Sequence, residues 1–145
     1  MHPAKEYLLK IRRLQQQIDW LDEEIEKNHY LLLPAGIRYD SMKVQTSLNN
    51  TLENAVIDIM ALLEKQIRRR TKLAKKRDII IAQIGRIPEE VERKILKDYY
   101  VDGLSLSGIA KKRNYSYDYI AHEHGQALNS FAQIILKKGI NNESD

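Results

Sequence analysis

The chain of 145 residues has the length of one typical domain, or of two small ones joined by a shared long element. It contains no cysteine, which excludes disulfide bonds and zinc–thiolate sites, and its net charge of +4 is mild. No apolar run approaches the ~20 residues that cross a bilayer, and the first residues become charged too early for a signal peptide, so we expect a soluble, cytoplasmic protein.

Few residues interrupt regular structure, because the chain has only three prolines and six glycines. Leu, Ile, Lys, Glu, Gln and Arg are plentiful, and these residues favour long helices over short strands. The composition therefore predicts an all-α fold.

The first predicted helix spans about residues 5–32 and carries a heptad seam, in which apolar residues recur in alternating steps of three and four. Pro34 and Gly36 are expected to end it. Because the apolar stripe is narrow, the helix needs a partner helix. The seam consists of Ala4, Tyr7, Ile11, Leu14, Ile18, Leu21, Ile25 and Leu32, with Asn28 as its one polar interruption.

A second long helix is predicted after the connection PAGIRYD, with Asp40 or Ser41 as its N-cap. A short loop between two amphipathic helices favours an antiparallel, coiled-coil-like helical hairpin over residues 1–86. Pairing of both stripes between two chains, and a homodimer of hairpins, are the alternatives. The second stripe consists of Val44, Leu48, Leu52, Ala55, Ile59, Leu62 and Ile67, and continues less cleanly through Ala74, Ile81 and Ile84.

Two further helices separated by a tight turn are predicted after a third helix over 88–101, because Ser105 and Ser116 are both N-cap residues. Asn114 lies in the turn, four residues after Ala110, and Ile120 lies ten residues after Ala110. This spacing is typical of a helix-turn-helix, where a small residue lets the helices cross closely and a residue tolerant of the left-handed conformation turns the corner. We therefore assign residues 87–138 to a helix-turn-helix domain and 139–145 to a flexible tail.

The segment VERKILKDYYVDGLSLSGIAKKRNYSYDYIAHEHGQAL resembles region 4 of bacterial sigma factors. The shared pattern is an apolar helix, a short glycine-containing loop, a helix with Leu-Ser followed by Ile-Ala, and a serine-capped recognition helix ending in Ala-Leu. It covers about 50 residues, from Pro88 to Ile135. With the preceding helices, the chain is similar to small phage and prophage proteins of Gram-positive bacteria, akin to the ArpU and RinA regulators of late genes. The resemblance implies binding to double-stranded DNA and control of transcription.

The amino end of the recognition helix is where such motifs contact base edges, while the end of the preceding helix crosses the DNA backbone. A tyrosine can stack on a sugar or donate to a phosphate, and Ala121 can touch a thymine methyl group. Asp118 either accepts from a cytosine amino group or stabilises the helix start. The predicted DNA-binding residues are Lys111, Lys112, Arg113, Ser116, Tyr117, Asp118, Tyr119, Ala121 and His122.

Two histidines of the recognition helix require separate interpretation. His122 and His124 are two residues apart and point roughly 200° away from each other on a helix, so they cannot chelate one metal ion together. If Ile120 faces the core, His124 shares its face as a packed residue. His122 then lies on the opposite side, as a groove contact or a plain surface histidine.

Positive charge is concentrated between Lys65 and Arg77, a segment with eight basic residues and no acidic one. The residues from Pro88 to Lys138 contain eight basic and seven acidic residues, so this module alone should bind DNA weakly and needs dimerisation, a second basic surface or RNA polymerase as a partner. The basic segment is either that second surface or a solvated face paired with acidic residues of the first helix. Its members are Arg68, Arg69, Arg70, Lys72, Lys75, Lys76 and Arg77, besides Lys65.

Two functional hypotheses follow. The first is a DNA-binding transcription regulator, and the second is a coiled-coil assembly or adaptor protein whose C-terminal module binds protein such as RNA polymerase. The sequence has no glycine-rich phosphate loop and no cysteine nucleophile, so we predict no enzyme activity, catalytic residue, metal or cofactor.

Overall fold

A computed structural model describes the backbone of residues 2–38 and 46–143 and the side-chain surroundings of residues 2–32 and 50–137. Every regular element in these ranges is helical, which confirms the all-α prediction. The elements in chain order are α1 (Pro3–Arg38), α2 (Thr46–Ile84), α3 (Glu90–Leu96), the π-helical segment η2 (Lys97–Val101), α4 (Leu106–Arg113) and α5 (Tyr117–Glu143). None of these helices is both long and apolar enough to span a bilayer.

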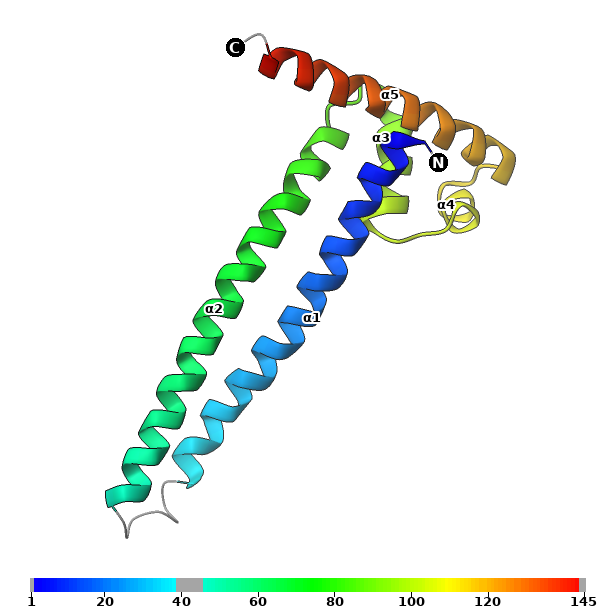
Figure 1. Cartoon of the computed structure of the whole chain (residues 1–145). Helices are drawn as coiled ribbons and strands as arrows, with labels where there is room; N and C mark the ends of the chain where they lie inside the picture. The colour runs from blue at the N-terminus through cyan, green and yellow to red at the C-terminus, as the bar shows by residue number, and fades with distance from the viewer. Residues whose placement is uncertain (1, 39–45, 144–145) are drawn as a thin grey trace. The chain divides into compact units, whose positions relative to one another are not determined.

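The helices α1 and α2 form the predicted hairpin, and short helices follow it (Figure 1). The described residues divide into two compact units, one from Met1–Gln15 with Lys75–Asp145 and the other from Gln16–Ala74. The first unit therefore contains the beginning of α1 and the end of α2 together with all the later helices. The second unit contains the rest of the hairpin. Helix α5 continues to Glu143 and so includes most of the segment assigned to a flexible tail.

Helix α1 is longer than predicted, because its backbone stays helical through Pro34 and Gly36 to Arg38. The prediction that these two residues end the helix is wrong. A proline inside a helix removes one hydrogen bond and clashes with one carbonyl, a cost of ~3 kcal/mol that long seam packing can offset. The proposed N-cap residues Asp40 and Ser41, and Val44, lie outside the described residues.

The seam of the second unit uses the predicted face of α1, where Ile18 and Leu21 are buried. Asn28 continues this seam, because its Nδ2 donates to Oε1 of Gln66 on α2 at 2.9 Å. Arg70, one turn further along α2, donates to both carboxylate oxygens of Asp22. Polar pairs therefore contribute to this seam beside the apolar residues.

The seam face of α2 agrees with the predicted one only in part. Leu52 and Ile59 are half-buried as predicted, whereas Ala55, Leu62 and Ile67 of the predicted stripe are exposed. The pattern was misread because α2 has apolar residues outside the seam, whereas two of its seam positions hold a glutamine and an arginine. The described seam residues of α2 in this unit are Leu52, Val56, Ile59, Leu63, Gln66, Arg70 and Leu73, which are buried or half-buried.

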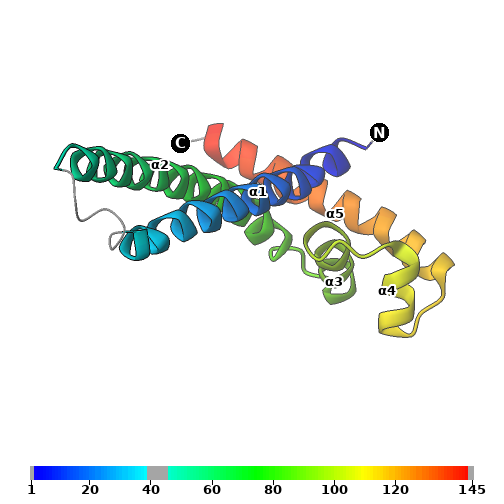
Figure 2. The ribbon, with the colours of Figure 1, turned by 90° about the horizontal axis from the view of Figure 1, so that it is seen from below.

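The first unit has its core where the hairpin base meets α5. Leu8 and Ile11 of α1 and Ile80 of α2 belong to one buried cluster with Ala127 and Phe131 of α5. Helices α3 and α4 both contact α5 (Figure 2). Burial of these apolar side chains is the main term that stabilises the unit. Helix α5 is therefore held by the hairpin base as well as by the short helices.

Candidate nucleic-acid interface

The turn between α4 and α5 has the local geometry that its sequence predicts. The Oγ atom of Ser105 accepts from the Gly108 amide at 3.0 Å and caps α4, while the Oγ atom of Ser116 accepts from the Tyr119 amide at 3.1 Å and caps α5. Asn114 adopts the left-handed conformation with φ 61° and ψ 43°. Since asparagine tolerates this conformation better than most residues, it can reverse the chain between the two helices.

A small apolar cluster holds the two helices together. Ile109 and Ala110 of α4 are buried with Ile120 of α5 and Ile95 of α3. The predicted core face of α5 is confirmed, because His124, Ala127 and Phe131 are also buried. Asp118, His122 and Gly125 are exposed, as expected for the opposite side. The register of α5 is therefore fixed by its apolar side, and its other side faces solvent within this unit.

The exposed amino end of α5 carries most of the predicted base-contacting residues. Ser116, Tyr117, Asp118 and Tyr119 are exposed, and Ala121 is half-buried. The rings of Tyr115 and Tyr119 lie 4.7 Å apart, so the turn and the first helical turn of α5 share an aromatic surface. Such a surface can contact sugars, bases or another protein.

The predicted phosphate contacts at the end of α4 are not equivalent. Nε of Arg113 donates to Oδ2 of Asp98 at 2.6 Å, and Nζ of Lys112 lies 3.2 Å from Oδ1 of the same carboxylate. Lys111 is exposed, and no ion pair joins it to another described residue. Lys111 is therefore the cation of this group that is most available to a phosphate.

Asp98 is the structural residue that sequence reasoning missed. Its side chain is 1% exposed, and it lies on the π-helical segment η2. Burial works to raise the pKa of Asp98, but the hydrogen bonds from Arg113 and Lys112 outweigh it and the pKa falls below its ordinary value. The available signal was its spacing, since Asp98 follows Val91 and Ile95 by seven and three residues on an apolar helical face. An acidic residue at such a position requires a cationic partner.

His124 is a packed histidine. Its Nε2 lies 3.0 Å from the hydroxyl oxygen of Tyr100, and the centroids of the Tyr99 and His124 rings are 5.1 Å apart. Burial lowers the pKa of His124, and the positive charge of Lys5 lowers it further. Among the described residues, no group of three or more potential ligands could hold a metal ion.

Some basic side chains of the segment from Lys65 to Arg77 on α2 are paired with other residues, and others are exposed. Arg70 is bound to Asp22, and Nη1 of Arg77 donates to Oε1 of Gln15 at 2.8 Å, so pairing with the first helix accounts for part of it. Arg68 pairs with Glu64 on its own helix. The remaining members are exposed and have no ion pair within the described part of the chain: Lys65, Arg69, Lys72, Lys75 and Lys76.

Comparison of the chain with known protein families, curated proteins and solved structures gives no match. The class that the structure defines is an all-α protein with a long helical hairpin and a compact module of short helices. The similarity to sigma region 4 and to phage regulators remains a prediction from the sequence.

Proposed function

We propose that the chain is a DNA-binding transcription regulator that reads promoter or operator DNA with the amino end of α5. The observation that carries this proposal is the exposure of Ser116, Tyr117, Asp118, Tyr119 and His122, which follow the left-handed turn at Asn114. A helix presented in this way, and held from behind by Ile120, has the form that enters a major groove.

The electrostatics support weak binding by a single module. Two of the three cations at the end of α4 are paired with Asp98, so they have less charge to offer to phosphates. Phosphate neutralisation supplies most non-specific affinity. We therefore expect binding that is detectable at low salt and that falls steeply as salt is added.

The test is a gel shift with DNA fragments that the chain recovers from its own genome, repeated over a series of salt concentrations. Lys111→Glu is expected to weaken binding to all sequences and to reduce the slope of log affinity against log salt by about 1. Lys137→Glu is the matched control, because it changes the same charge on an exposed residue ~30 Å along α5 from Tyr117. Binding that is absent at low salt, or equally weakened by both variants, would contradict the proposal.

A second candidate is an adaptor whose C-terminal module binds a protein such as RNA polymerase. The exposed tyrosines at positions 115, 117 and 119 favour it, because tyrosine is enriched at protein interfaces. The acidic Asp118 among them is unfavourable beside DNA phosphates. This candidate predicts partner binding with little dependence on salt and no gel shift, so the same salt series distinguishes the two.

A further inference from the structure

Helix α2 carries an exposed apolar stripe besides the one that packs on α1. Ile57, Met60 and Ile67 are 61%, 57% and 45% exposed. Together with Glu64 these residues occupy positions 57, 60, 64 and 67, each one residue after a seam position. Because successive residues of an α-helix are about 100° apart, the stripe lies about 100° around the helix from the seam. This is the arrangement of a helix in a four-helix bundle, where each helix packs against two neighbours.

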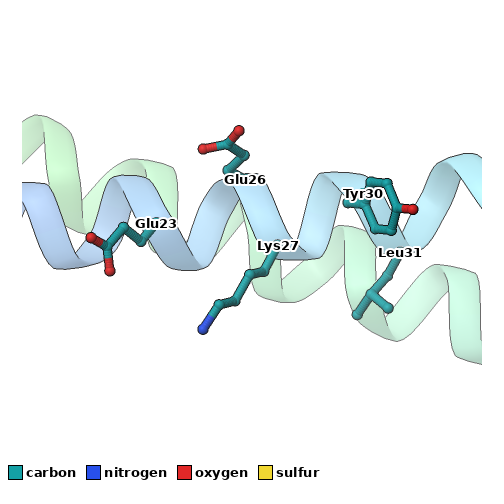
Figure 3. Close-up of a pocket in the computed structure, with 5 residues that line it drawn as sticks. All are labelled: Glu23, Glu26, Lys27, Tyr30 and Leu31. Carbon is teal, nitrogen blue, oxygen red and sulfur yellow. The ribbon is translucent and has the colours of Figure 1, made fainter.

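The stripe borders a groove of about 660 Å³, to which His29 and Leu32 of α1 also contribute. A hollow of similar size lies along α1, but Glu23, Glu26 and Lys27 account for three of its five lining residues (Figure 3). Burying those charges would be costly. The groove beside the stripe is lined mostly by apolar residues, and its two charged side chains, Glu64 and Arg68, pair with each other, so the apolar side of α2 is the better docking surface.

Charge along α2 identifies the partner. Residues 50–61 contain two acidic residues, Glu53 and Asp58, and no basic one. Residues 65–72 contain five basic residues and no acidic one. An antiparallel copy of α2 therefore places each acidic segment beside the basic segment of its mate, whereas a parallel copy places like charges together.

We propose that a second copy of this chain packs on the stripe, with the two α2 helices antiparallel about a two-fold axis that crosses the stripe at the level of residue 62 along α2. In this register Ile57 lies opposite Ile67 of the partner subunit, and Met60 lies close to its own symmetry mate. Both hairpins then contribute to a four-helix bundle with an isologous interface. The proposal does not depend on DNA binding.

The test measures the mass of the full chain by sedimentation equilibrium over a concentration series without DNA. The wild type is expected to dimerise. The double variant Ile57→Glu, Ile67→Glu should raise the dimer dissociation constant at least about a hundredfold, because two carboxylates enter an apolar contact. Leu62→Glu is the matched control, since Leu62 is 44% exposed and lies about 140° from both residues around α2. It should leave the dimer intact, and circular dichroism should show equal helix content in all three proteins.

Because the chain has no cysteine, single introduced cysteines can test whether the two α2 helices are antiparallel. With Ile57 opposite Ile67, the two copies of residue 60 are ~6 Å apart along the axis, and those of residue 53 are ~27 Å apart. A short thiol cross-linker should therefore join the Met60→Cys protein and leave the Glu53→Cys protein unlinked. A wild type that stays monomeric, a dimer that survives the double substitution, or equal cross-linking at both positions would overturn the proposal. Binding of a different protein to a monomer through this stripe would also overturn it.

Discussion

The buried carboxylate of Asp98 should be a major determinant of the stability of the C-terminal module, and Asp98→Asn tests this. Breaking a buried charge pair by removing one partner costs ~3–5 kcal/mol. Here the side chains of Arg113 and Lys112 remain 25% and 50% exposed, so water can solvate them again after the change. Asparagine also keeps one acceptor oxygen. Charged hydrogen bonds contribute ~1.5–3 kcal/mol, so we expect a loss of about 2 kcal/mol.

The assay is urea unfolding at neutral pH followed by far-UV circular dichroism, with Asp102→Asn as the control. Asp102 is exposed and carries the same charge only four residues away, so its loss should change stability by less than about 0.5 kcal/mol. Because the pKa of Asp98 is lowered in the folded chain, its stabilisation is complete above the unfolded value of ~3.9 and is lost as the pH falls through the folded value. The difference between wild type and Asp98→Asn should therefore shrink in acid. If Asp98→Asn and Asp102→Asn had equal free energies of unfolding at neutral pH, the reasoning would be refuted.

Two further predictions concern the same module. Because burial lowers the pKa of His124, the unfolded chain binds its proton more readily, and stability should fall as the pH drops through about 6.5. In His124→Gln this part of the pH dependence should vanish, which urea titrations at several pH values would show. Ser105→Ala removes the cap of α4 and should cost about 1 kcal/mol in the same assay, whereas Ser107→Ala, at an exposed position inside α4, should cost little; equal losses would contradict the capping role.

Local chemistry explains what could be predicted from the sequence. Ser105, Asn114 and Ser116 determine their own backbone geometry, because a cap or a left-handed turn depends on a few neighbouring atoms. The seam of α1 was also predictable, since its apolar series follows one heptad register. In each case the information lies within a few residues of the feature.

What could not be predicted depends on pairs distant in sequence. The α2 seam includes Gln66 and Arg70, whose partners lie 38 and 48 residues away on α1. Asp98 is likewise explained by cations 14 and 15 residues later. A pattern of apolar residues cannot reveal such polar pairs, so it placed the exposed residues Ala55, Leu62 and Ile67 on the seam.

The position of the candidate interface depends on more than α4 and the turn before α5. The amino end of α5 is presented to solvent, but further along the same helix Ala127 and Phe131 pack with Leu8 and Ile11 of α1. Nη2 of Arg12 also donates to the carbonyl of Tyr99 at 2.6 Å, which ties α1 to the segment that carries Asp98. Since an α-helix of this length bends little, a change at the hairpin base moves the exposed end of α5 with it. The base of the hairpin is therefore part of the apparatus that positions the candidate interface.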